Sequence, residues 1–411
     1  QRRVAFAIDV SGSMYAALSV IQNNLCTWAN GMMAESPGLS LVTFTDTTVN
    51  VVGTTCDPTE FAGWVKNLTP GAEETVSKTV LDATLEAGDL AGSGGTVILV
   101  TNAVIKEGAD VLERAVVTEG GVLERAVVLE PADVTEALRR KRVKVCTIWD
   151  SPTRGVGAEI ATATGGISIT SFDDLDLALN EVLEISTPGL RDFAHIVGAV
   201  TTTMIGPIPV PVDGSGQRLD LIVTSPDLWT THALELQRPD NSIVDPSDPG
   251  VAFVSTPTFS SVRVTAPTPG EWKVYILGNG DFQLSAMVLS DLALFDAAFL
   301  KVTTVCSESP PLIIPIEGPL SSGQPVEVAI DLLGEIFQPT FELVGRDGSV
   351  IGTLDVQEDV FGLGTYSGAY LPTEGIDLFR IRVRGTGPSG EAIQRILPRS
   401  FSVFASDDRG H

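Results

Sequence analysis

The stretch Val4-Ala5-Phe6-Ala7-Ile8-Asp9-Val10-Ser11-Gly12-Ser13-Met14 decides how the first part of this chain folds. Its first five residues form an unbroken apolar run, which is typical of a strand buried on both faces of a sheet. Apolar side chains then recur at helical spacing, at Leu18, Ile21, Leu25 and Trp28. A buried strand followed at once by an amphipathic helix predicts the opening unit of an α/β domain.

The same alternation of strand and helix continues to about residue 190. Because successive parallel strands need crossover connections, we expect a doubly wound, mainly parallel sheet with helices on both faces. The predicted strands lie at 39–44, 49–52, 96–100 and 143–149, and the predicted helices at 61–68, 76–87 and 173–185.

One seven-residue segment of this region occurs twice. The sequence Val111-Leu112-Glu113-Arg114-Ala115-Val116-Val117 recurs letter for letter at 122–128, a period of 11 residues that is close to three helical turns. Because Gly120 and Gly121 separate the copies, we expect two short helices rather than one. We interpret the repeat as a tandem duplication that enlarges one crossover; a helix pair that binds a partner is the alternative.

After residue 190 the periodicity changes from helical to alternating. Short apolar-polar runs are separated by turn sequences such as Pro239-Asp240-Asn241 and Gly278-Asn279-Gly280. This pattern predicts antiparallel β-sandwiches. We therefore predict three domains: an α/β domain at 1–190, an all-β sandwich at 191–305, and a second, Ig-like sandwich at 306–411.

The composition of the 411 residues limits the possible functions. The formal charge is −26, from 52 acidic and 26 basic side chains. Such a surface repels phosphate backbones, so we expect no nucleic-acid partner. No apolar run reaches the length of a membrane span, so none is expected in this chain. Because the chain opens at Gln1 and reaches a predicted strand by Val4, we expect that a leader or upstream region has been removed.

The four cysteines are Cys26, Cys56, Cys146 and Cys306. They include no CxxC pair, so a structural zinc site is not expected. Disulfides in a secreted protein and buried thiols both remain open. One specific hypothesis is a Cys26–Cys56 disulfide, with two separate buried thiols as its alternative.

The sequence does not indicate an enzyme. The three histidines, His195, His232 and His411, all lie beyond the first predicted domain, which argues against Ser-His or Cys-His catalysis there. The chain has neither a Gly-x-Ser-x-Gly elbow nor a Gly-x-x-x-x-Gly-Lys phosphate loop. We therefore expect no catalytic residues and no site for an organic cofactor.

A cluster of oxygen ligands is the strongest functional signal. Asp9, Ser11 and Ser13 follow a buried parallel strand and precede a helix, so one tight loop brings a carboxylate and two hydroxyls to the edge of the sheet where such folds bind ligands. Hard oxygen ligands suit Mg²⁺, with Ca²⁺ or Mn²⁺ as alternatives.

This motif and its placement resemble the von Willebrand factor A family, whose metal-ion-dependent adhesion site uses Asp-x-Ser-x-Ser. The resemblance implies that Thr75, in the loop before the predicted helix at 76–87, is a further metal ligand. It also assigns to Asn102 a position where the family has an aspartate. That departure predicts weaker metal binding. Glu73 or Glu74 could restore the charge, although we interpret both as solvated loop acids.

The opening of the chain further resembles the A domain of hemicentins and their extracellular relatives, in which β-sandwich domains follow. The stretches Pro269-Gly270-Glu271-Trp272-Lys273-Val274 and Gly364-Thr365-Tyr366-Ser367-Gly368 resemble turns of extracellular sandwiches. The resemblance implies a secreted or cell-surface adhesion protein whose divalent cation engages an acidic side chain of a protein ligand. The alternative is a self-assembling structural subunit of an extracellular array or filament, with a weak or vestigial metal site. A role inside the cell, in an assembly or chelatase complex, fits the tandem sandwiches poorly.

Overall fold

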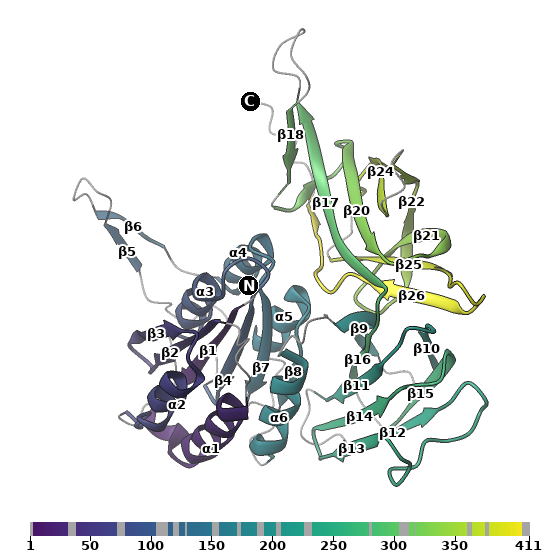
Figure 1. Ribbon diagram of the computed structural model, residues 1–411. Helices are drawn as coiled ribbons and strands as arrows, with labels where there is room; N and C mark the ends of the chain where they lie inside the picture. The colour runs from purple at the N-terminus through teal and green to yellow at the C-terminus, as the bar shows by residue number, and fades with distance from the viewer. Residues whose placement is uncertain are drawn as a thin grey trace. The chain divides into compact units, whose positions relative to one another are not determined.

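The protein is described by a computed structural model (Figure 1). The chain folds into two compact units: Gln1–Thr187 with Pro226–Leu228, and Pro188–Ser225 with Trp229–His411. The described residues are 3–31, 38–71, 79–103, 114–117, 123–127, 130–149, 156–170, 174–186, 193–202, 207–225, 232–278, 282–303, 312–316, 318–359, 364–374 and 378–404.

The described part of the first unit is built on a six-stranded sheet in the order β3-β2-β1-β4-β7-β8. All neighbouring strands are parallel except β3, which runs antiparallel to β2. The sheet is therefore mixed and mostly parallel, as expected. The strands are β1 (Arg3–Asp9), β2 (Gly38–Phe44), β3 (Val49–Thr55), β4 (Thr96–Thr101), β7 (Lys144–Trp149) and β8 (Ser168–Thr170).

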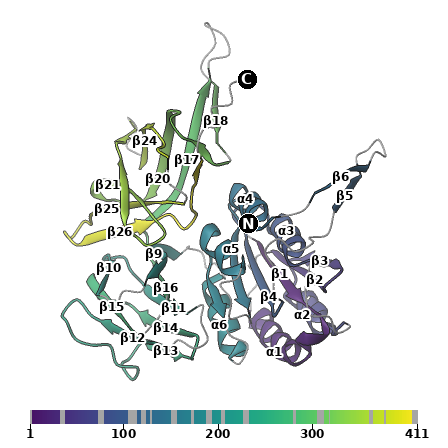
Figure 2. The same cartoon turned by 180° about the vertical axis from the view of Figure 1, so that it is seen from behind.

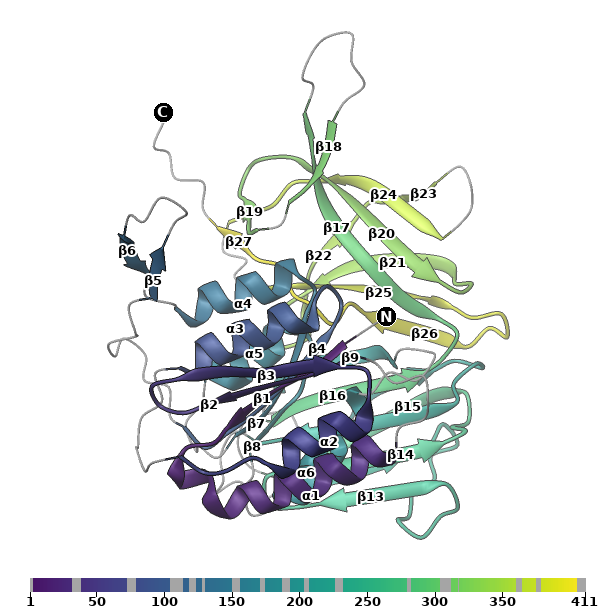
Figure 3. The ribbon, with the colours of Figure 1, turned by 60° about the vertical axis from the view of Figure 1, so that its left-hand side comes forward.

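Helices cover both faces of this sheet (Figure 3). Alternate residues of β1 explain how: Ala5 and Ala7 pack in a core with α3, α4 and α5, whereas the ring of Phe6 meets Trp28 of α1 and Phe61 of α2 on the other face. Burial on both faces is why β1 is apolar throughout. The helices are the 3₁₀ turn η1 (Gly12–Met14), α1 (Tyr15–Gly31), α2 (Pro58–Lys66), α3 (Val80–Ala91), α4 (Pro131–Arg140), α5 (Val156–Thr164) and α6 (Leu175–Ser186).

The described residues of the repeated segment, 114–117 and 123–127, are strands and not helices, so the expectation of two short helices was wrong. Its copies contribute β5 (Arg114–Val117) and β6 (Leu123–Val127), which pair antiparallel as a two-stranded sheet. Valine-rich runs on either side of a Gly-Gly pair favour a hairpin. That local preference outweighs the helical period of 11.

The second unit contains antiparallel sheets that enclose two cores. The first core, around Trp272, lies between the three-stranded sheet β10-β15-β12 and the five-stranded sheet β13-β14-β11-β16-β9 of the described residues. The strands are β9 (Phe193–Thr202), β10 (Ile208–Val212), β11 (Arg218–Thr224), β12 (His232–Gln237), β13 (Val251–Ser255), β14 (Phe259–Thr265), β15 (Gly270–Gly278) and β16 (Phe282–Leu289).

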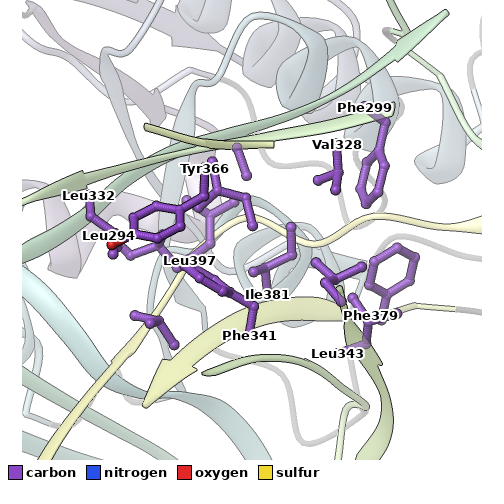
Figure 4. Close-up of a cluster of buried hydrophobic side chains, with 14 of the residues drawn as sticks. Leu294, Phe299, Val328, Leu332, Phe341, Leu343, Tyr366, Phe379, Ile381 and Leu397 are labelled. Carbon is purple, nitrogen blue, oxygen red and sulfur yellow. The ribbon is translucent and has the colours of Figure 1, made fainter. Parts of the chain in front are cut away.

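The second core is rich in aromatic side chains: Phe299 lies against Phe379, and Phe341 lies against Tyr366 (Figure 4). The sheets around it are β18-β17-β20-β24-β23, β22-β21-β25-β26 and the parallel pair β19-β27. The strands are β17 (Ala293–Thr303), β18 (Leu312–Pro315), β19 (Leu320–Ser321), β20 (Val326–Leu333), β21 (Phe337–Val344), β22 (Val350–Leu354), β23 (Gln357–Glu358), β24 (Thr365–Tyr370), β25 (Arg380–Thr386), β26 (Ala392–Ile396) and β27 (Val403–Phe404).

A buried ion pair connects the two sets of sheets within this unit. Arg395 of β26 is fully buried and binds the carboxylate of Asp213, which follows β10. The same guanidinium donates to Ser290 Oγ at 3.1 Å and to the carbonyl oxygen of Leu292 at 2.9 Å. The division into three domains at residues 190 and 305 stays a prediction.

Candidate metal centre

Asp9 occupies the carboxyl end of β1, between β2 and β4. Its side chain is fully buried. Oδ1 accepts a hydrogen bond from the backbone N–H of Ser11 at 2.9 Å, and Oδ2 accepts one from Thr101 Oγ1 at 2.6 Å. Hydrogen bonds to both oxygens hold this carboxylate in one orientation at the edge of the sheet.

Three further oxygens form a row beside this carboxylate. Ser11 Oγ lies 3.0 Å from Ser13 Oγ, and Ser13 Oγ donates to Asn102 Oδ1, also at 3.0 Å. Ser11 is buried, Ser13 is exposed and Asn102 is partly buried, so the row reaches solvent at its middle member, Ser13. The η1 turn fixes the two serines, because the N–H of Met14 donates to the carbonyl oxygen of Ser11 and the Met14 side chain is fully buried.

Backbone hydrogen bonds bring the next loops to the same point. The N–H of Val10 donates to the carbonyl oxygen of Phe44 at 2.8 Å. The N–H of Gly71 donates to the carbonyl oxygen of Val10 at 2.6 Å. A Cβ on Gly71 would lie 3.3 Å from both Val10 O and Thr45 Cγ2. Glycine is therefore what permits this close approach. The structure thus anchors residue 71 against the Asp9 loop. Thr75 and the two loop acids, Glu73 and Glu74, lie outside the described residues.

Two residues of this edge were not foreseen from the sequence. Thr101, the last residue of β4, holds Asp9 Oδ2 and also accepts from the N–H of Ala103 at 3.0 Å. Asp46 follows β2 and is 5% exposed. The position of Asp46 in the sequence could have indicated it, because Asp46, like Asp9, comes at the carboxyl end of a buried apolar strand. It adds a second buried carboxylate to this edge of the sheet.

The oxygen row fits a divalent cation. An octahedral Mg²⁺ binds its ligands at about 2.1 Å, which places adjacent ligand oxygens about 3.0 Å apart. Both contacts in the row, Ser11 to Ser13 and Ser13 to Asn102, have that spacing. The row consists of hydroxyl and amide oxygens, so most of the negative charge must come from the carboxylate of Asp9 behind it. Among the described residues, no group of three or more His, Cys, Asp or Glu side chains is placed to hold a metal ion.

The thiols do not form the hypothesised Cys26–Cys56 disulfide, which was wrong. Cys26 is buried on α1 and its Sγ donates to the carbonyl oxygen of Ala62, whereas Cys56 is an exposed free thiol. Burial raises the pKa of Cys26, and the nearby charge of Lys66 only partly opposes that effect. Cys146 is a buried free thiol, and Cys306 lies outside the described residues. The alternative, that Cys26 and Cys56 are two separate buried thiols, is also wrong, because Cys56 is exposed.

No family model and no curated protein matches this sequence. Solved structures that match include an aerotolerance-related membrane protein from Bacteroides fragilis NCTC 9343 carrying multiple mutations to serines (14% identity, TM-score 0.32) and the conserved hypothetical protein BatB from Bacteroides thetaiotaomicron (15% identity, TM-score 0.32). Each match covers 45% of this chain and 98% of the other. Likeness at that score supports no conclusion about function. Among the described residues, no helix is long and apolar enough to cross a membrane.

Proposed function

We propose that this chain is a non-enzymatic, metal-dependent adhesion protein, secreted or displayed at the cell surface, whose first unit is a von Willebrand factor A-type domain. The observation that supports this best is the oxygen row Ser11–Ser13–Asn102 beside the buried carboxylate of Asp9. In this proposal Ser11, Ser13 and Asn102 hold a divalent cation, Mg²⁺ or alternatively Ca²⁺ or Mn²⁺. When bound, the cation attracts a carboxylate of a protein ligand.

The residues of the chain have distinct tasks in this proposal. Asp9 supplies negative charge from a buried position. Its carboxylate can be buried because both of its oxygens accept hydrogen bonds within the fold. Ser13 is exposed, so a ligand approaches from its side of the row. The family resemblance adds Thr75 as a ligand. Because Asn102 is neutral, less of the positive charge is cancelled, which favours attraction of a partner's carboxylate.

The cation would also solve an electrostatic problem. The chain carries a formal charge of −26, which repels an acidic ligand at long range. A local positive charge at Ser13, the exposed member of the oxygen row, offers such a ligand one favourable place to bind. Binding should therefore depend strictly on the cation and strengthen at higher ionic strength, where the general repulsion is screened.

The experiment is cation-dependent capture of an acidic ligand. The full chain is immobilised and exposed to a displayed library of peptides that contain Asp or Glu, with Mg²⁺ or with EDTA. The proposal expects binders that EDTA releases and that Ser13→Ala weakens, while Asp89→Ala behaves as the wild type. Asp89 is a matched control, because it is an exposed carboxylate near the end of α3 that pairs with Lys141. Binding that is indifferent to EDTA would contradict the proposal.

The neutral Asn102 also favours a second candidate function. With one carboxylate fewer than the family pattern, the site could be vestigial, and the chain would then be a structural subunit of an extracellular array or filament. Self-association that persists unchanged in EDTA, together with no detectable cation binding, would support this second function over adhesion.

A further inference from the structure

Asp46 is, in addition to Asp9, a buried carboxylate at the carboxyl edge of the first unit's sheet. It belongs to the short connection 45–48 between β2 and β3, and β2 lies between β1 and β3 in the sheet (Figure 2). Thr47 and Thr48 of the same connection are exposed, whereas Asp46 is only 5% exposed. Connections between strands are normally solvated, so this one carboxylate is directed into the protein while its neighbours face water.

The connection that carries Asp46 is held against the loop that carries Asp9. In the parallel pair of β1 and β2, Asp9 is opposite Phe44, and the N–H of Val10 donates to the carbonyl oxygen of Phe44 at 2.8 Å. Neighbouring strands are about 4.8 Å apart, and the two residues from Phe44 to Asp46 span at most about 7 Å. The Cα atoms of Asp46 and Asp9 are therefore roughly 9 Å apart.

The oxygen row needs more negative charge than its own members carry. Ser11, Ser13 and Asn102 are neutral, and only Asp9 contributes a carboxylate directly beside them among the described residues. A charge acts on a cation at a distance, because the Coulomb energy falls only as the inverse of the separation. Salt screens exposed charges over about 8 Å at physiological ionic strength, but it screens buried charges much less.

We infer that Asp46 supplies the second negative charge of the cation site, in place of the carboxylate that the family pattern has at Asn102. This inference rests on the proposed function. Asp46 attracts the cation from the buried side of the edge and takes none of its coordination positions. The exposed side at Ser13, where a ligand carboxylate approaches, therefore gains no negative charge that would repel the ligand.

The test is calorimetric titration of the full chain with Mg²⁺ and Mn²⁺. Asp46→Asn keeps the shape of the side chain, removes its charge and should weaken cation binding about tenfold. The double variant Asp46→Asn/Asn102→Asp moves the charge into the oxygen row and should bind at least as tightly as the wild type. Asp89→Asn is the matched control: it removes an exposed carboxylate that pairs with Lys141, and it should bind as the wild type does.

The double variant separates a role through charge from a merely structural one, because a structural defect at residue 46 is not repaired by a charge at residue 102. Thermal scans in EDTA verify that each variant is folded, and Asp46→Ser, a second neutral variant, should weaken binding equally. The inference is overturned if Asp46→Asn binds as tightly as the wild type, or if the double variant binds no more tightly than Asp46→Asn. A wild type that binds no cation would overturn the proposed function together with the inference, whereas normal binding by Asp46→Asn overturns the inference alone.

Discussion

Arg395→Met tests the ion pair that joins the two sets of sheets in the second unit. The substitution keeps a side chain of similar length but leaves the carboxylate of Asp213, which is 3% exposed, without its cation. Removing one partner of a buried pair costs about 3–5 kcal/mol, since the remaining charge stays buried. The Ser290 and Leu292 oxygens lose a donor as well.

The expected loss corresponds to a large shift in one thermal transition. For a unit of 150–250 residues, 1 kcal/mol moves the midpoint by about 2–4 °C, so the transition of the second unit should fall by about 6–20 °C. Differential scanning calorimetry of the full chain follows both units at once. Arg384→Met, which alters a half-exposed arginine of β25, should shift the same transition only slightly.

The pH dependence has a definite sign. Burial alone raises the pKa of Asp213, but the charge of Arg395 and hydrogen bonds from Ser215 more than offset it, so the pKa is lowered. A lowered pKa stabilises the folded state above the unfolded value of about 3.9, and this contribution is lost as pH falls through the folded value. In Arg395→Met the burial of Asp213 is no longer opposed by the arginine, so the difference between wild type and variant should be largest at neutral pH and shrink steadily as the pH falls toward and below about 4. An unchanged transition in the variant, or a difference that grows in acid, would refute the reasoning.

Three further predictions concern the site and the second core. Asn102→Asp should tighten divalent-cation binding about tenfold or more in calorimetric titration. The reason is that a unit charge about 5 Å from a dication is worth roughly 6 kcal/mol before desolvation. Weaker binding by the variant would contradict this charge explanation. Thr101→Val removes the donor to Asp9 Oδ2 and should lower the stability of the first unit by about 1–3 kcal/mol. Calorimetry measures this loss, and an unshifted transition of the first unit would contradict it. Phe299→Ala should cost the second unit about 3–5 kcal/mol in the same scan; a change in cation affinity would show that the two units are not independent.

Strands buried on both faces were predictable from the sequence, whereas shorter or polar elements were not. β1 and β4 contain continuous apolar runs and β7 is mostly apolar, and all three were located within one or two residues. The helix α5 was missed because its Gly, Ala and Thr residues show little apolar periodicity. β10 was missed because Pro209 and Pro211 argue against a strand; it is the edge of its sheet, where a residue without an N–H is tolerated.

The candidate site was predictable where it is local in sequence. Asp9, Ser11 and Ser13 lie on one loop, so their spacing alone brings them together. The contact between Ser13 and Asn102 spans 89 residues and exists because β4 is the neighbour of β1. Asn102 was placed by family resemblance. The hydrogen bond from Thr101 to Asp9 depends on the side-chain direction at the end of β4, which no pattern in the sequence indicates.

Calorimetric titration of the full chain with Mg²⁺, Mn²⁺ and Ca²⁺ tests the metal centre most directly. Wild type and the control Asp89→Ala should bind at least one of these ions with the same affinity, Ser13→Ala should bind it more weakly, and Asp9→Ala should not bind it. Because Asp9 is fully buried and its replacement could disturb folding, the exposed Ser13 is the decisive variant. No binding by the wild type, or unchanged affinity in Ser13→Ala and in a folded Asp9→Ala protein, would contradict the metal site.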